Sequence, residues 1–334
     1  MIWLTWRQFR APIWAALGAL AVLATALAVT GPGLRDFYAD SGLATCRDDC
    51  AEGARTFLAQ ATAGIHLPLY LGGLIVMVVL PALVGLFWGA PLVARELEAG
   101  TFRLIWSQSV TRTRWLSVKL LGGAAVSVAF AGLASLAVSW WAVPFDKAYD
   151  NRIQPQVFPM RGIVPIGYAA LAFVLGVAVG MILRRTVAAM ALTLVAVAAI
   201  QIVMPFWVRP HLATPVRIEQ ALDTSELRSL MMSDGGRIEV TGHVDSPGAW
   251  VVSNETMTSD GRPFTGPYDE NVCGRIGDPS ECKTWLGSLG LRQRAAYHPA
   301  ERVWTLQWRE TALLRALAVV VAGGCFWWLR RRLT

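Results

Sequence analysis

Long apolar runs, separated by charged segments, dominate the hydrophobic pattern of the chain. A membrane-spanning helix needs about 20 mostly apolar residues. Five runs reach this length without one charged residue: 11–34, 67–94, 120–145, 162–183 and 186–208. They predict membrane-spanning helices at about 12–31, 68–91, 120–143, 162–183 and 186–208.

A sixth apolar run, 311–329, is shorter and contains Arg315. That side chain lies near one end of the run, where a long arginine can reach the headgroups. Three aromatic residues at 326–328 and the arginines at 330–332 follow, which is typical of the edge of a membrane span. The pattern therefore predicts an all-α polytopic membrane protein with six transmembrane helices.

Basic residues predict the orientation of these helices. With the N-terminus inside, the inside segments 1–10, 95–119, 184–185 and 330–334 hold twelve basic and two acidic residues. The outside segments 35–66, 146–161 and 209–310 hold seventeen basic and twenty-one acidic residues. An excess of Lys and Arg in short loops marks the cytoplasmic side. We therefore expect a multi-pass protein of the plasma membrane with both termini in the cytoplasm.

Composition agrees with this class. Of 334 residues, 54% are hydrophobic and 16% charged, against about a quarter charged in soluble domains. The net charge of +7 is explained by Lys and Arg in the cytoplasmic loops of a membrane protein. The sequence has no basic stripe that would predict a nucleic-acid partner.

The first helix has two further interpretations. Arg7 and Arg10 before an apolar run also fit a cleavable signal peptide, but the run is long and the charge count requires this helix to be retained. Residues 1–10 mix tryptophans and cations, which fits either an interfacial helix on the cytoplasmic surface or a plain charged anchor.

Glycine and proline in the spans predict features of packing. Gly176 and Gly180 have the spacing that lets two membrane helices approach closely. Pro81 is expected to kink its helix. None of the six runs contains an acidic residue, which argues against transport driven by an ion gradient.

The segment 209–310 is long enough for a small folded domain outside the membrane. We expect a mixed α/β, loop-rich domain, with a helix around 217–232 and a strand at 237–244.

Four of the five cysteines fall in outside segments. Cys46, Cys50, Cys273 and Cys282 allow three disulfide pairings, of which the local pairs 46–50 and 273–282 need the least organisation. Cys325 lies in the sixth span and fits a small packing residue.

Motifs of enzyme chemistry are missing from the sequence. It has no Walker A motif, no Gly-x-Ser-x-Gly and no His-Glu-x-x-His, and its four histidines are scattered singly. We therefore expect no catalytic residue, no metal site and no directly bound cofactor.

The inside segment 95–119 is the most informative loop. Glu96 and Glu98 open it, Gly100 and Thr101 follow, and Phe102, Ile105 and Trp106 form a short apolar helical face. Such a helix suits a soluble partner, and the two acids could pair with cations on that partner. A plain interfacial loop would show the same pattern.

The pattern Glu96-x-Glu98-x-Gly100-Thr101, with 109–112 and Lys119, resembles the ABC-2 type permeases, the membrane subunits of ABC exporters. The layout of a surface helix, six spans and a loop after the second span is similar too. So is the patch 297–308, followed by Glu310, which resembles permeases common in actinobacteria. The large segment 209–310 departs from the family, whose members often have a smaller connection there.

The resemblance implies a permease subunit that couples a separate ATPase to export of a hydrophobic or amphiphilic compound. ATP would bind the partner subunit, and a second copy or a related permease would complete the assembly in the lipid bilayer. Glu96, Glu98, Gly100 and Thr101 would shape the coupling helix, and the ATPase would bury Phe102, Ile105 and Trp106. A membrane-anchored sensor or scaffold that uses 209–310 is the alternative, and a membrane-embedded enzyme comes last.

Overall fold

The computed structural model describes residues 2–47, 50–102, 111–225, 227–233, 237–266, 270–273 and 279–332. The chain divides into two compact units. The helical unit comprises Met1–Leu212 and Trp304–Thr334, and the small unit comprises Ala213–Val303.

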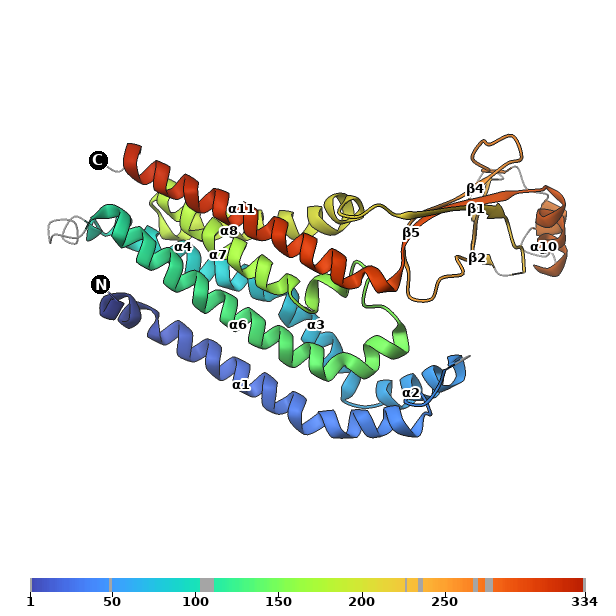
Figure 1. The fold of residues 1–334 in the computed structure, drawn as a ribbon, viewed down its shortest axis with the longest axis horizontal. Coiled ribbons are helices and arrows are strands. Elements are labelled where there is room, and N and C mark those ends of the chain that lie inside the picture. Colours follow the sequence, from blue (N-terminus) through green and yellow to red (C-terminus); the bar gives the residue numbers. More distant parts are fainter. Residues whose placement is uncertain are drawn as a thin grey trace. The chain divides into compact units, whose positions relative to one another are not determined.

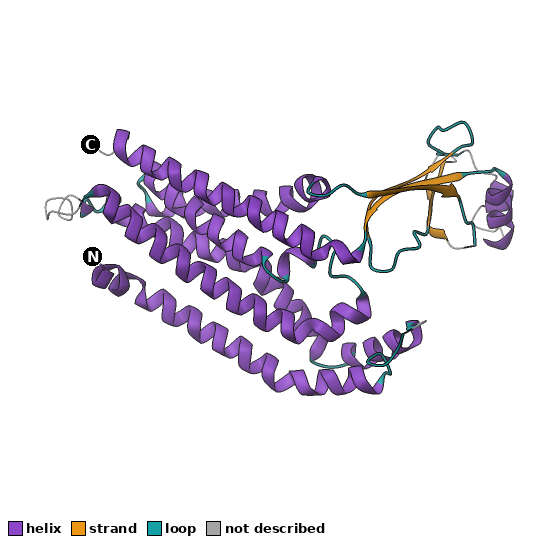
Figure 2. Cartoon of the chain, in the orientation of Figure 1, coloured by secondary structure: helices purple, strands orange, loops and turns teal. Residues whose placement is uncertain are grey.

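Helices make up almost all of the helical unit (Figures 1 and 2). Its α-helices are α1 (Ile2–Asp40), α2 (Ala51–Thr62), α3 (His66–Leu83), α4 (Ala90–Glu98), α6 (Arg112–Tyr149), α7 (Val164–Leu183), α8 (Thr186–Val203) and α11 (Val303–Arg332). The π-helical segments η1 (Val84–Gly89) and η3 (Met204–Val208) continue α3 and α8, and η2 (Phe158–Met160) and η4 (Arg209–His211) are short 3-10 turns.

Six helical segments within the described ranges are long and apolar enough to cross a membrane, which confirms the expected number. They are Pro12–Asp40, His66–Glu98, Arg112–Tyr149, Val164–Leu183, Thr186–His211 and Ala300–Arg331. Within the helical unit, the start of α1 and the end of α11 lie at the same end of the bundle (Figure 1).

The helices extend beyond the apolar runs that predict them. Residues 2–10 continue directly into the first span, and α1 ends only at Asp40. The amphipathic α2, which the sequence pattern did not reveal, buries Phe57 and Ala61. Because helices continue past their apolar runs, several acids that lay outside those runs become helical, and three of them are buried: Glu96, Asp146 and Glu310.

The span α7 is the most buried of the six. Of its apolar window 61% is buried, against 22% for α8. A Cβ added to Gly176 would lie 2.5 Å from the carbonyl oxygen of Gly85, and one on Gly180 would lie 2.6 Å from that of Ala90. Both positions therefore tolerate only glycine, which confirms the close helix approach predicted from their spacing. The surface that these two glycines contact begins at η1, which starts three residues after Pro81.

Two small sheets form the strand part of the small unit. The strands are β1 (Val216–Ala221), β2 (Leu227–Ser233), β3 (Arg237–Gly242), β4 (Trp250–Met257) and β5 (Arg292–His298). One sheet has the antiparallel order β1-β5-β4, and β2 pairs with β3 in the other.

The helix expected around 217–232 is wrong, because β1 and β2 occupy this range. Between them, the Asp223 carboxylate accepts a 2.8 Å hydrogen bond from the backbone N–H of Ser225, a turn that interrupts helical hydrogen bonding. The strand expected at 237–244 is confirmed as β3, which ends at Gly242.

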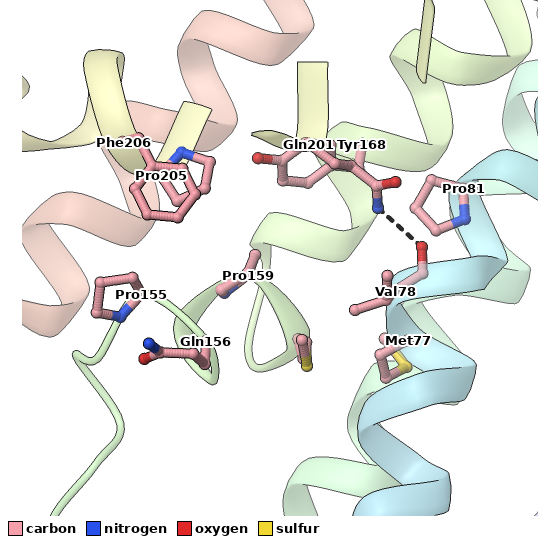
Figure 3. Close-up of a pocket in the computed structure, with 11 residues that line it drawn as sticks. Met77, Val78, Pro81, Pro155, Gln156, Pro159, Tyr168, Gln201, Pro205 and Phe206 are labelled. Carbon is pink, nitrogen blue, oxygen red and sulfur yellow. Dashed lines mark hydrogen bonds between the residues drawn. The ribbon is translucent and has the colours of Figure 1, made fainter. Parts of the chain in front are cut away.

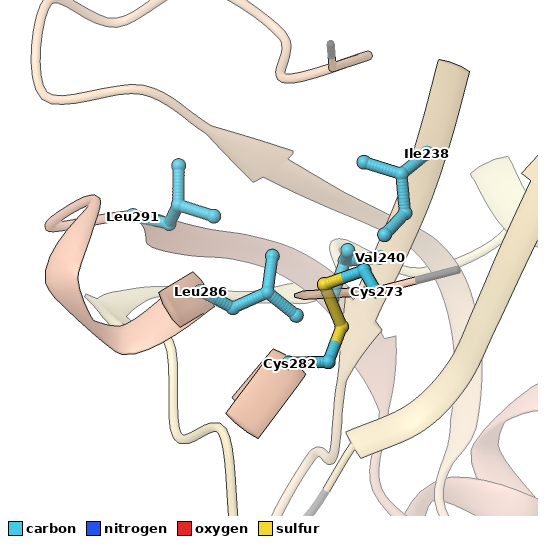
Figure 4. Close-up of a cluster of buried hydrophobic side chains, with 6 residues drawn as sticks. All are labelled: Ile238, Val240, Cys273, Cys282, Leu286 and Leu291. Carbon is cyan, nitrogen blue, oxygen red and sulfur yellow. A yellow bond between two sulfur atoms is a disulfide. The ribbon is translucent and has the colours of Figure 1, made fainter. Parts of the chain in front are cut away.

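A compact apolar cluster holds the small unit together (Figure 4). Its buried members are Ile238, Val240, Cys273, Cys282, Leu286 and Leu291. A disulfide joins Cys273 of α9 (Glu270–Cys273) to Cys282 of α10 (Pro279–Ser288), and a second joins Cys46 to Cys50. These are the two local pairings that the sequence favours. Cys325 is a buried free thiol.

Candidate functional site

A buried ion pair joins the two ends of the segment 95–119. The Lys119 ammonium lies 2.6 Å from the Glu96 carboxylate and donates a 3.0 Å hydrogen bond to the Leu92 carbonyl. The Trp115 indole N–H donates to the other carboxylate oxygen of Glu96 at 3.1 Å. The last turns of α4 and the first turns of α6 are therefore fastened by one carboxylate.

Glu96 thus has its cation within its own chain. Pairing with a cation on a partner, which the sequence allowed, is not open to Glu96 in this structure, because the residue is 6% exposed and both carboxylate oxygens are bonded. An intact buried pair of this kind resists disruption, since removal of one partner leaves a buried charge.

Glu98 fastens the same segment to a third helix. Its carboxylate accepts hydrogen bonds from the backbone N–H of Thr186 at 2.9 Å and from its hydroxyl at 2.6 Å. Thr186 is the first residue of α8, where unpaired N–H groups and the helix dipole favour a negative charge. Glu98 is thereby an N-terminal cap supplied from 88 residues away.

The remaining predicted loop residues surround the end of α4. Gly100 has a φ of +70°, a backbone conformation that favours glycine, and the Thr101 hydroxyl donates a 3.4 Å hydrogen bond to the Glu96 carbonyl. Phe102 is half-buried. Ile105 and Trp106 lie outside the described residues. After the gap, Thr111 caps α6 by accepting a hydrogen bond from the N–H of Arg114 at 3.3 Å.

At the other end of α6, residues 150–163 form a cap segment that is anchored by buried polar groups. Arg209 makes a bidentate contact with Glu310, at 2.6 and 3.0 Å, and donates to the Pro155 carbonyl at 3.3 Å. Both side chains of this pair are fully buried. The Tyr168 hydroxyl also donates to Glu310, at 3.1 Å.

Two more side chains complete the anchoring of the cap segment. Arg161 donates to both oxygens of Asp146, at 3.2 and 3.4 Å. The Gln307 amide oxygen accepts from the N–H groups of Ile163 and Val164, and its nitrogen donates to the carbonyls of Phe158 and Arg161. Gln307 thus accepts from the N–H groups at the start of α7, which have no partner within the helix, and donates to the cap segment as well.

Sequence reasoning missed these groups as functional candidates. Arg209, Asp146 and Arg161 were assigned to outside segments, and no acid was expected inside a span. Their burial depends on partners 15 to 101 residues away, which periodicity does not reveal. The sequence signal that could have found them is that Asp146 and Glu310 stand directly beside apolar runs.

A pocket of about 200 Å³ lies under the cap segment (Figure 3). It is lined by Met77, Val78 and Pro81 of α3, Pro155, Gln156, Pro159 and Met160 of the cap segment, Tyr168 of α7, Gln201 of α8, and Pro205 and Phe206 of η3. The Gln201 amide N–H donates to the Val78 carbonyl at 2.8 Å. An apolar lining with a few polar groups suits an apolar or amphiphilic molecule.

Comparison with known families gives one match, and it covers more than half of the chain. Residues 17–209 match the model of the family described as ABC-2 membrane transporter related. No curated protein and no solved structure matches the chain significantly. The matched region contains the second, third and fourth spans, most of the first and fifth, and the whole of 95–119. Together with its six apolar helices, this match shows that the chain is a multi-pass membrane protein and belongs to the ABC-2 membrane transporter related family.

Proposed function

We propose that this chain is the permease subunit of an ATP-driven exporter, and that a separate ATP-binding subunit acts on its segment 95–119. One observation carries the proposal: Glu96 and Lys119 close this segment at both ends with a buried 2.6 Å ion pair. A segment fastened in this way transmits a force to α4 and α6 together.

The bond from Glu98 to Thr186 extends this connection to α8. Displacement of the segment therefore displaces the spans that contain α4, α6 and α8. Two of these three spans line the pocket under the cap segment, one through α8 and the other through α3, which η1 joins to α4. Coupling in such a system requires a packed element with two arrangements that the partner can bias. The clamped segment and the pocket are the two ends of that element.

In this proposal the chain itself binds no cofactor. ATP binds the partner subunit, and two permease chains, identical or related, form the path through the bilayer. The apolar lining of the pocket supports export of an apolar or amphiphilic compound.

The proposed orientation places 95–119 and both termini in the cytoplasm of a cell whose plasma membrane holds the chain. The excess of basic residues in the short inside loops supports it. The two disulfides support it independently, because disulfides persist on the oxidising side, where this orientation puts Cys46–Cys50 and the small unit.

The test of this proposal is copurification with an ATP-binding subunit encoded beside this chain. Replacement of Phe102, Ile105 and Trp106 by alanine should reduce the copurified subunit at least about tenfold, since hot-spot aromatics contribute about 2 kcal/mol or more. Phe87→Ala is the matched control, because Phe87 is exposed on η1 within the second span. Equal copurification of the triple variant and the control would remove this loop from the partner interface.

A second function, ligand binding by the small unit, is favoured by the separate core of residues 213–303. The two functions differ in a deletion experiment. Replacement of 213–303 by a short linker should leave copurification of the ATP-binding subunit intact if the chain is a permease. An ATPase that never associates with the full chain would instead favour the sensor.

A further inference from the structure

A second hollow of the helical unit, the side groove, shares no lining residue with the pocket under the cap segment. This side groove has a volume of about 510 Å³, within the range of small-molecule sites. It is lined by residues of α6, of the cap segment, of the start of α7 and of the start of α11: Gly132, Ser135, Leu136, Ser139, Trp140, Val143, Asp146, Lys147, Arg152, Gly162, Ile163, Ile166 and Trp304.

The α6 wall of the groove is an exposed apolar stripe. Leu136, Trp140 and Val143 are 68%, 45% and 43% exposed and recur at helical spacing. Ile163 and Ile166 line the groove from the other side, and Trp304, 49% exposed, lines it from α11. A continuous apolar surface of this kind fits a hydrocarbon chain.

The polar groups in the floor of the groove are already hydrogen-bonded. The Ser135 hydroxyl donates to the Gly162 carbonyl at 2.7 Å, and the Ser139 hydroxyl accepts from the Gly162 N–H at 3.3 Å. Backbone groups at membrane depth must be satisfied within the protein. Because the N–H and the carbonyl of Gly162 both have partners, an apolar molecule in the groove meets no unpaired backbone group of this residue.

Cations lie at the end of the groove that continues the apolar stripe. Lys147 is one helical turn beyond Val143, and Arg152 lies over the Trp304 ring at 6.0 Å. Asp146 is the one acid among the lining residues, all of which are described, and Arg161 binds both of its oxygens. The end of the groove is therefore cationic.

We propose that the side groove binds an anionic amphiphile. Its hydrocarbon chain lies along Leu136, Trp140 and Val143, and its anionic headgroup is held by Lys147 and Arg152. Such a molecule fits because the apolar stripe matches its hydrocarbon chain, and the cations at the edge of the span match its anionic headgroup.

The test uses the full chain in discs of phosphatidylcholine and two photoactivatable probes, a diazirine fatty acid and the corresponding fatty alcohol. Crosslinked peptides are mapped by mass spectrometry. The acid should label the peptides of 132–147 and 162–166 more than the alcohol does. Two cations at about 1 kcal/mol each correspond to roughly 30-fold in affinity, so the double variant Lys147→Gln/Arg152→Gln should lower acid labelling to that of the alcohol.

The matched control is Arg331→Gln. Arg331 lies over the exposed Trp327 ring at 5.1 Å, at the opposite end of α11, so it reproduces the chemistry of Arg152 and Trp304 outside the groove. This variant should leave labelling of the groove unchanged. A second variant, Gly132→Leu, fills the groove without changing its charge and should reduce labelling by both probes.

Three results would overturn the proposal. The first is equal labelling of the groove by acid and alcohol in the unaltered chain. The second is retention of acid labelling in the double variant while it remains monodisperse. The third is competition by inorganic phosphate down to the level of the alcohol, which would show that the cations bind a free anion without a hydrocarbon chain.

Discussion

The Glu98 carboxylate caps the first turn of α8 by accepting hydrogen bonds from the N–H and the hydroxyl of Thr186 at 2.9 and 2.6 Å. The contact ties the end of the second span to the start of the fifth. It is also the point where the segment 95–119 meets a helix that lines the pocket.

Loss of this cap should loosen the start of α8. In Glu98→Ala the Thr186 N–H loses its acceptor, and side-chain caps contribute about 1 kcal/mol. Hydrogen exchange of the peptide 184–190 should accelerate about fivefold. Glu98→Gln keeps an acceptor, so its peptide 184–190 should exchange at a rate between those of the unaltered chain and Glu98→Ala. Unchanged exchange in Glu98→Ala would show that water replaces the carboxylate without loss.

The Glu96–Lys119 pair should show strong coupling between its two partners. Lys119→Met leaves the buried Glu96 carboxylate without its cation and should destabilise the protein by about 3–5 kcal/mol. Glu96→Gln/Lys119→Met removes both charges and should recover much of that loss. Thermal unfolding of the four proteins in one detergent measures the coupling. Additive effects of the two single substitutions would contradict the buried pair.

Contact between α7 and η1 should exclude any side chain at Gly176. In Gly176→Ala the new Cβ would lie 2.5 Å from the Gly85 carbonyl oxygen, so the helices must separate. We expect a loss of about 1–3 kcal/mol, as for overpacked cores. Gly72→Ala, on α3, is the matched control, because an added Cβ there has no neighbour within 4 Å. If the two variants unfold at the same temperature, the close approach is not present in the membrane.

The disulfide of the small unit should determine its resistance to proteolysis. Cys273 and Cys282 are nine residues apart and both belong to the apolar cluster, so Cys273→Ala/Cys282→Ala should lose roughly 2–3 kcal/mol. Limited proteolysis within 213–303 should then occur at lower protease concentration. Cys325→Ala, which removes a thiol outside any disulfide, should leave that digestion pattern unchanged.

The other disulfide, Cys46–Cys50, reports the orientation of the chain. After reduction of intact cells, a membrane-impermeant thiol reagent should label Cys46 and Cys50 if their segment faces outward. A cysteine introduced at Thr334 should stay unlabelled until the cells are opened. The opposite pattern would reverse the proposed topology.

The sequence by itself determined the membrane class, the number of spans and the close approach at Gly176 and Gly180. These follow from long apolar runs and small-residue spacing, which are local properties of the chain. The local disulfide pairings followed for the same reason, since their partners are four and nine residues apart. The helix predicted locally at 217–232 was wrong, because pairing of β1 with the distant β5, pairing of β2 with the adjacent β3 and the turn at Asp223 decided for β-structure.

Only the tertiary structure decided what the acids do. The sequence allowed Glu96 to pair with a cation on a partner, and in the structure it pairs with Lys119 of its own chain. Glu310 stands beside an apolar run in the sequence, but it is fully buried because Arg209, 101 residues away, supplies its charge partner. Composition records that a charge is present; whether it is solvated or buried depends on which distant cation the fold brings within reach.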